Sequence, residues 1–260
     1  MTKKILILIF LLVASPVFAL TSNTHSTDLE ADSSQYWSIT DAAQTGLDIT
    51  DSITISLRIK GESFNVAQLT TFLSKYVATQ QSYFFDYDNN GSLCFLNSGN
   101  GTTNSQQCVS WTPSTGTWYM VSVTYNPVSE EKKFYINDSQ QGVTQAGGSA
   151  GMFNSTSPVY IGNFVGALFS DGLHDDMRIW SRELSGTEIS NLYNNPCTFD
   201  NGANLQAWWL WDNDAGVDQT ANNNDLTNNG TATFSTTAAY ACAAAGGAEV
   251  NNSQVIMVGI

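Results

Sequence analysis

The sequence predicts an all-β fold, an antiparallel β-sandwich of the jelly-roll type with one short helix. Two patterns carry this prediction: short runs in which apolar and polar residues alternate, and clusters of Asn, Gly and Ser between the runs. In residues 53–60, alternation puts four apolar side chains on one face of a strand, namely Ile53, Ile55, Leu57 and Ile59. Many short strands joined by such turns are typical of a sandwich.

Six further strands and one helix follow from the same patterns. The strands are expected at residues 83–87, 92–96, 118–125, 133–137, 158–162 and 176–180. The helix is expected at 185–194, because Ser185 and Glu188 form a capping box ahead of Ile189 and Leu192. We expect this helix to lie across one end of the sandwich and to cover an open edge of the core.

The first residues have the pattern of a secretory signal peptide. Lys3 and Lys4 precede an apolar run from Ile5 to Val13, and small side chains lie near Ala19, after which we expect cleavage. The run is shorter than the roughly 20 residues that a membrane-spanning helix needs. The sequence therefore predicts a signal peptide at 1–19, no membrane span, and a secreted or cell-surface protein.

Length and charge narrow the class of protein further. Residues 20–243 are expected to form one sandwich, closed by residues 198–243, and residues 244–260 a flexible tail. Nine Lys and Arg residues against 23 Asp and Glu residues give a formal net charge of −14. Phosphate backbones repel such a surface, so nucleic acid is not an expected partner. The acidity indicates either a well-solvated surface or carboxylates that hold a cation.

Four cysteines in an exported chain predict two disulfides. Three pairings are possible, and we favour the two local ones, Cys94 with Cys108 and Cys197 with Cys242. The first would join neighbouring strands, and the second would tie down the C-terminal segment. The cysteines and the two histidines show no clustered spacing, so a zinc site is not expected.

Two stretches resemble a known family. Residues 171–196, DGLHDDMRIWSRELSGTEISNLYNNP, closely resemble the last strand and following helix of laminin-G-like domains in the concanavalin A-like lectin/glucanase superfamily. Residues 117–138, TWYMVSVTYNPVSEEKKFYIND, are similar to the central hairpin of such domains. The resemblance runs from about Asp28 to Pro196 and implies a concanavalin A-like jelly roll.

The opening segment of such domains is missing at the N-terminal side and has a counterpart at the other end. Residues 205–227, LQAWWLWDNDAGVDQTANNNDLT, resemble that segment. It either closes the same sandwich in permuted order or begins a second repeat. Closure is favoured by the expected Cys197–Cys242 bridge and by the cost of leaving Trp208, Trp209 and Trp211 without a core.

Candidate catalytic residues do not emerge from the sequence. Glucanases of this fold act through two carboxylates at alternate positions of one strand, flanking the glycosidic bond. The chain has no Glu-x-Asp-x-Glu run, and its Gly-x-Ser-x-Gly match at residues 147–151 lies in a cluster of turn-forming residues and not between a strand and a helix, as a nucleophile elbow does. We therefore expect a protein that is not an enzyme.

The resemblance implies a possible calcium ion, with Asp171, Asp175 and Asp176 as its ligands. The alternative is that these carboxylates accept hydrogen bonds from backbone amides. A second acidic run, from Asp86 to Gly91, fits the first half of a calcium-binding loop. Asn97 stands where that loop needs a bidentate Glu, so we interpret the run as an ordinary hairpin turn.

Aromatic side chains are the candidate ligand-binding residues, since flat rings stack on the apolar faces of sugars. We assign this role to Trp37, Trp208 and Trp209, beside the alternative that they fill the core. Trp208 and Trp209 are adjacent, so they face opposite sides of a strand. The resemblance implies a binding or adhesion module for a carbohydrate or an extracellular protein. The alternatives are a structural domain of a larger envelope or matrix protein and, third, a glycoside hydrolase.

Overall fold

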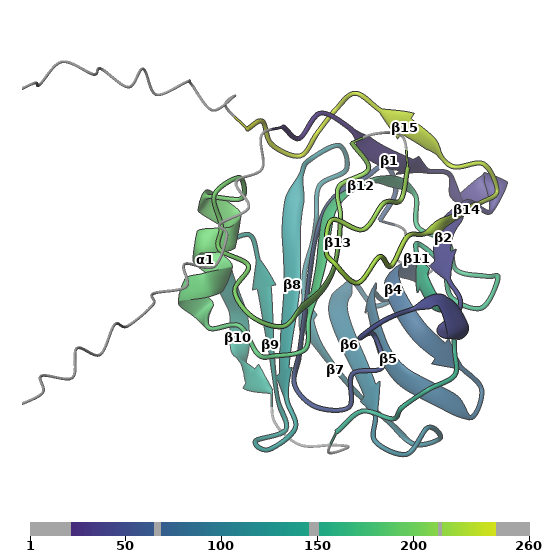
Figure 1. The fold of residues 1–260 in the computed structure, drawn as a ribbon. Coiled ribbons are helices and arrows are strands. Elements are labelled where there is room, and N and C mark those ends of the chain that lie inside the picture. Colours follow the sequence, from purple (N-terminus) through teal and green to yellow (C-terminus); the bar gives the residue numbers. More distant parts are fainter. Residues whose placement is uncertain (1–21, 65–68, 146–150, 213–214, 243–260) are drawn as a thin grey trace, which may run out of the picture.

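The predicted strands pair into two antiparallel sheets that pack face to face, so the all-β sandwich is confirmed (Figure 1). The structure is a computed structural model that describes residues 22–64, 69–145, 151–212 and 215–242. In this part of the chain, no helix is long and apolar enough to cross a membrane.

The first sheet, here called sheet A, has eight strands. Their order is β10 (Ser139–Gln145), β9 (Glu131–Ile136), β8 (Tyr119–Asn126), β3 (Ile53–Gly61), β12 (Gly172–Trp180), β1 (Ser26–Leu29) and β15 (Thr233–Ser235), and β13 (Leu205–Trp209) also pairs with β12. The long strand β12 has two partners along one edge, because β1 pairs with its first residues and β13 with its last ones.

The second sheet, sheet B, has seven strands. Their order is β14 (Thr227–Asn229), β2 (Tyr36–Ile39), β11 (Val159–Ile161), β4 (Thr70–Val77), β5 (Gln80–Tyr87), β6 (Ser92–Ser98) and β7 (Asn104–Ser110). Two short 3-10 helices, Ala31–Ser33 and Asp41–Ala43, flank β2. Strands β1, β2, β4, β7 and β10 were not expected from the alternation of apolar and polar residues.

The main core lies between the two sheets. Strand β3 supplies the four apolar side chains predicted for its inner face, and these pack with Val123 of β8 and Phe85 of β5. The outer face of β3 differs from the prediction of a half-buried strand. Thr54, Ser56 and Arg58 are also buried, because further segments cover this side of sheet A.

The single α-helix, α1 (Gly186–Asn194), begins where the sequence predicts. The Ser185 hydroxyl accepts a hydrogen bond from the Glu188 backbone N–H, and the Glu188 carboxylate accepts one from the Ser185 N–H, which completes the capping box. Its position corrects our expectation of a helix across one end. Ile189 and Leu192 pack on the outer face of sheet A, in a second apolar cluster that also contains Met120, Tyr135, Trp180, Leu184 and Phe199.

The C-terminal segment belongs to the same two sheets. Its three strands pair with β12, β2 and β1, and no second repeat begins there in the described residues. Trp209 and Trp211 enter the main core beside Trp37. Both predicted disulfides are confirmed: Cys94–Cys108 joins the neighbouring strands β6 and β7, and Cys197–Cys242 ties the segment after α1 to the C-terminal end of the fold.

Truncation tests whether this segment is part of the fold. A chain of residues 20–196 lacks β13, β14 and β15, which exposes edges of β12 and β2 and removes two core tryptophans. We expect it to aggregate, because open edges and apolar strips invite association. Light scattering and thermal melting beside residues 20–243 measure this. A soluble monomer that melts cooperatively at the temperature of the longer chain would contradict the assignment.

Acid stability should depend on His174 of β12. The imidazole is fully buried, with Nε2 2.7 Å from the Ser170 hydroxyl, and burial lowers its pKa to about 3. The unfolded chain takes up a proton near pH 6.5 and the folded chain does not, so protonation favours unfolding between pH 6.5 and about 3. Relative to His174→Gln, the native protein should lose about 1.4 kcal/mol of unfolding free energy per pH unit in this window.

Urea unfolding of both proteins at pH 7, 5.5 and 4.5 measures this difference. The comparison removes the contribution of every other titrating group, which both proteins share. A constant difference across the three pH values would show that the imidazole takes up its proton equally in the folded and unfolded states.

Candidate functional site

Two of the three candidate calcium ligands, Asp175 and Asp176, lie in the middle of β12, and Asp171 directly precedes the strand, but the three do not form one cluster. Among the described residues, they are not part of any group of three acidic, His or Cys side chains with ligand atoms within 4.8 Å of one another. One Asp171 oxygen accepts a weak hydrogen bond from the Ala31 N–H at 3.4 Å. Asp175 and Asp176 are buried under the C-terminal segment.

Asp175 and Asp176 already have partners of other kinds. The Asp175 carboxylate accepts hydrogen bonds from Asn23 Nδ2 at 3.0 Å, the Ala239 N–H at 2.8 Å and the Asp176 N–H at 2.7 Å. Burial and the nearby Asp176 raise the pKa of Asp175 to about 8. This carboxyl group is a poor ligand for a hard cation, because its raised pKa favours the neutral form and its oxygens already accept three N–H hydrogen bonds.

Asp176 is the centre of a buried ion network on the outer face of sheet A. One of its oxygens accepts from Arg178 Nε at 2.7 Å and from the Trp208 indole N–H at 2.8 Å, and the other lies 3.6 Å from Arg58 Nε. Two guanidinium groups thus occupy the space where calcium was expected. These contacts favour a buried ion network over a calcium site, and the expectation of calcium at Asp171, Asp175 and Asp176 is left to the substitution test below.

The candidate stacking residues Trp37, Trp208 and Trp209 are all buried, which corrects the expectation that they bind a ligand. Trp37 and Trp209 lie in the main core, and Trp208 lies 4.2 Å under the Arg178 guanidinium on the opposite face of its strand. Each indole N–H donates to a protein oxygen. Rings that are covered on both faces cannot stack on a sugar.

A different aromatic surface lies on the outer face of sheet B. Six rings from the four strands β2, β4, β5 and β11 and from the loop after β11 gather there, and we call them the aromatic strip: Tyr36, Tyr76, Phe84, Tyr160, Phe164 and Phe169. Strand register puts Tyr160 beside Ser74 and Ser74 beside Phe84, so these positions form one row across β11, β4 and β5. All six rings except Phe84 are partly exposed.

The loop of residues 163–169 joins the two halves of the strip. Ser74 donates its hydroxyl hydrogen to the Asn163 carbonyl at 2.9 Å, which holds the loop against the middle of the sheet. On one side Phe164 packs on Phe84, with ring centroids 4.9 Å apart. On the other side Phe169 packs on Tyr36 at 6.1 Å. The loop therefore extends one aromatic surface over several strands.

The tip of this loop is strained and exposed. Phe164 and Ala167 exchange backbone hydrogen bonds of 3.1 and 2.9 Å, which closes a tight turn. Val165 sits in that turn with φ 52° and is 51% exposed. A β-branched residue is disfavoured in this left-handed region, and such conformations often mark functional loops.

Charged groups are scarce on this face. In the strands of sheet B that the structure describes, Asp86 of β5 is the single acidic residue. It is fully buried, and burial together with Asp88 raises its pKa well above the usual range. A retaining or inverting glycosidase needs two carboxyl groups across the bond it cleaves, and the nearest second carboxyl group, that of Asp88 in the turn after β5, is also buried.

Sequence reasoning missed most of the strip, although one signal points to it. In β5, SYFFDY, the residues Tyr83, Phe85 and Tyr87 face the core, and Phe84 must then face outward. Aromatic residues on both faces of one strand indicate a second apolar surface. The contribution of Phe164 and Phe169 depends on how the loop folds back over the sheet, which periodicity does not report.

The sequence matches a known superfamily that has this fold. A family model described as the concanavalin A-like lectin/glucanases superfamily matches residues 31–190, and the chain belongs to this superfamily. The sequence resemblance to that superfamily is thereby confirmed. A search of curated protein sequences gives no match.

Several solved structures share the fold at low sequence identity. One is a candidate carbohydrate-binding protein from Bacteroides ovatus, with TM-score 0.63 and 16% identity, covering 85% of this chain and 62% of that one. The heptameric SAP-like pentraxin from Limulus polyphemus gives TM-score 0.57 and 15% identity, covering 82% and 94%. The CBM40 of a Ruminococcus gnavus IT-sialidase, solved with α2,3-sialyllactose, gives 0.51 and 14%, covering 66% and 100%. These likenesses show the fold, and the chain spans less than two thirds of the Bacteroides protein.

The role of Asp176 can be tested by substitution. Asp176→Asn leaves Arg58 and Arg178 buried beside a neutral amide, and breaking a buried ion pair in this way costs about 3–5 kcal/mol of unfolding free energy. Denaturant unfolding measures the loss, with the exposed Asp51→Asn as control. The loss should be equal with calcium and with a chelator. If calcium instead stabilises the native protein, by about 2.7 kcal/mol at a hundredfold excess over its Kd, these acids hold the ion.

Proposed function

We propose that the protein is a secreted, non-catalytic carbohydrate-binding module that holds a glycan against the aromatic strip. The observation that carries the proposal is the gathering of six rings on one open sheet face with no charged side chain among them. Membership of a lectin and glucanase superfamily and the likeness to carbohydrate-binding structures support it.

The chemistry of the strip suits a neutral sugar chain. Sugar rings present C–H groups on their faces, which pack on aromatic rings, and hydroxyl groups at their edges, which need hydrogen-bond partners. Amide and hydroxyl groups border the strip: Asn104 Nδ2 lies 3.3 Å from the Tyr76 hydroxyl, and Asn229 Nδ2 lies 2.9 Å from the Ser38 hydroxyl. Beneath the loop, buried Asn163 has an Nδ2 donor without a partner.

Export and the lack of catalysis rest on separate observations. The N-terminal signal-peptide pattern and the two disulfides support an extracellular location. The two carboxyl groups of Asp86 and Asp88 on the outer face of sheet B are both buried, which supports binding without hydrolysis. An extracellular protein ligand on the same strip is the second candidate, favoured by the exposed Val165 at the loop tip. A purely structural domain of a larger envelope or matrix protein is the remaining alternative.

A glycan array tests the proposal directly. Purified residues 20–243 should bind a defined subset of neutral glycans, with equal signals in calcium and in a chelator. Tyr36→Ala and Tyr76→Ala each remove one ring from the strip and should weaken binding of the best glycan about tenfold, which corresponds to about 1.4 kcal/mol.

Matched controls separate a binding site from a folding defect. Val165→Ala changes the loop tip and should alter affinity, whereas Val128→Ala changes a 93% exposed valine in the turn between β8 and β9 and should not. Melting temperatures of all variants report folding. Glycan binding that survives both tyrosine substitutions would move the site elsewhere. No binding to any glycan would leave a protein ligand or a structural role.

A further inference from the structure

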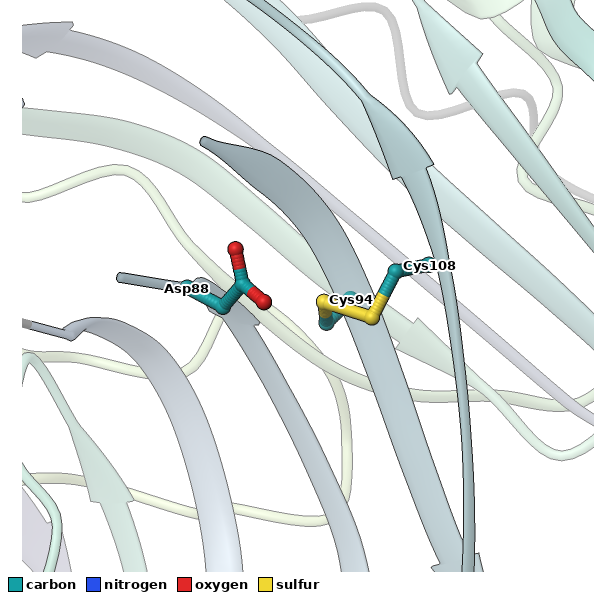
Figure 2. A group of neighbouring side chains, drawn as sticks. All are labelled: Asp88, Cys94 and Cys108. Carbon is teal, nitrogen blue, oxygen red and sulfur yellow. A yellow bond between two sulfur atoms is a disulfide. The ribbon is translucent and has the colours of Figure 1, made fainter. Parts of the chain in front are cut away.

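A cluster of one carboxylate and two cysteine sulfur atoms lies on the outer face of sheet B, near its β7 edge. The Asp88 carboxylate and the sulfur atoms of Cys94 and Cys108 lie within 4.8 Å of one another. Figure 2 shows the Asp88 carboxylate turned toward the disulfide that joins β6 to β7. Disulfide sulfurs are weak metal ligands, whereas two thiolates and a carboxylate at this spacing are a ligand set for a soft divalent ion.

The side chain of Asp86 independently indicates that a ligand is missing beside this cluster. It is 0% exposed, and neither of its carboxyl oxygens has a hydrogen-bond partner. Asp86 pairs directly with Cys94 across β5 and β6, so both side chains point to the same face. It also precedes Asp88 by two residues. A buried polar group without a partner is costly, and its presence beside the cluster indicates a missing ligand.

Another unpartnered atom adjoins Asp86 on the same face. Thr71 of β4 pairs with Asp86, is fully buried, and leaves its hydroxyl without a hydrogen bond. The row Thr71, Asp86, Cys94 and Cys108 thus runs across β4, β5, β6 and β7. Asp88, by contrast, uses its oxygens to accept from Asn90 and from the Ser92 N–H. Its carboxylate is therefore fixed in place by the hairpin turn and needs no rearrangement of the backbone to face the sulfurs.

We propose that Cys94, Cys108, Asp88 and Asp86 form a redox-gated site for a soft divalent metal ion such as Zn²⁺ or Cd²⁺. The site is closed while the disulfide is intact and opens when an external dithiol reduces it. The metal would then join β6 to β7 in place of the disulfide. Thiolate and carboxylate ligands in a four-coordinate arrangement match the preferences of Zn²⁺.

The reaction balances in two steps. First, a dithiol reductant gives two electrons and two protons to the Cys94–Cys108 disulfide, which becomes two thiols while the reductant becomes its own disulfide. Second, the metal ion binds both sulfurs and displaces their two protons into solvent. In the reverse direction, an external disulfide takes two electrons from the two thiolates and becomes a dithiol, the Cys94–Cys108 bond forms again, and the metal ion is released.

Cadmium titration of the reduced protein tests this site. A Cys197→Ser, Cys242→Ser variant removes the other disulfide, so that Cys94 and Cys108 are the two thiols present after reduction and removal of the dithiol under argon. We expect one cadmium ion per chain, a thiolate-to-cadmium ultraviolet band, and release of two thiol protons in weakly buffered solution. The oxidised protein should show none of these.

Substitutions identify the carboxylate ligands. Asp88→Asn and Asp86→Asn should each raise the Kd for cadmium at least about tenfold, whereas the exposed Asp51→Asn should leave it unchanged. Melting of the oxidised variants shows whether they fold. A readout that needs no carboxylate variant is alkylation: bound cadmium should protect Cys94 and Cys108 from iodoacetamide, as mapped on peptides.

Several results would overturn the proposal. One is complete alkylation of Cys94 and Cys108 in the presence of cadmium. Another is an equal Kd for cadmium in the oxidised and reduced proteins. A third is a Kd in the folded Asp86→Asn and Asp88→Asn variants equal to that of the protein that keeps both carboxylates. Zinc competition against bound cadmium distinguishes the two ions: displacement at similar concentrations assigns the site to both, and failure to displace restricts it to cadmium.

Discussion

The outer half of sheet A depends on one buried carboxylate, that of Asp176. Through Arg58 it is linked to the last turn of α1, because Arg58 Nη2 donates to the carbonyl of Tyr193 at 3.1 Å. Through Arg178 it is linked to the segment after the helix, since Arg178 Nη1 donates to Asn201 Oδ1 at 2.9 Å. Trp208 joins β13 to the same oxygen. A charge pair can remain buried here because almost every donor in it has a partner.

The two sheets therefore have different outer faces. On sheet A, α1 and the C-terminal segment seal a polar network, and the Cys197–Cys242 disulfide holds the covering chain in place. On sheet B, the loop of residues 163–169 lies against the middle of the sheet, and five of the six rings of the aromatic strip keep some exposure. If the aromatic strip binds a glycan as we propose, the sandwich presents its ligand surface on one side only, which suits a module that binds an extended or surface-attached glycan.

The sequence predicted what local patterns determine. Alternation located β3, the capping box located α1, and short separation along the chain favoured the two observed disulfides. It did not predict which outer face would be covered. Arg and Asp usually lie in solvent, and Arg58 and Asp176 are buried only because the fold brings two guanidinium groups, a carboxylate and an indole together. For the same reason Trp37, Trp208 and Trp209 were assigned to a ligand. Burial of an aromatic ring is decided by segments distant in the sequence, and periodicity within one strand does not contain that information.

The pairing of β1 with β15 has a consequence for how this fold tolerates rearrangement. Ser26 and Ser235 are direct partners, so the first and last strands lie side by side at one edge of sheet A (Figure 1). A circular permutant could join these strands through a short linker and open the chain at an exposed hairpin instead, with every strand pair retained. The segment that opens related domains can for this reason stand at the far end of this chain: connectivity changes while the set of neighbouring strands does not.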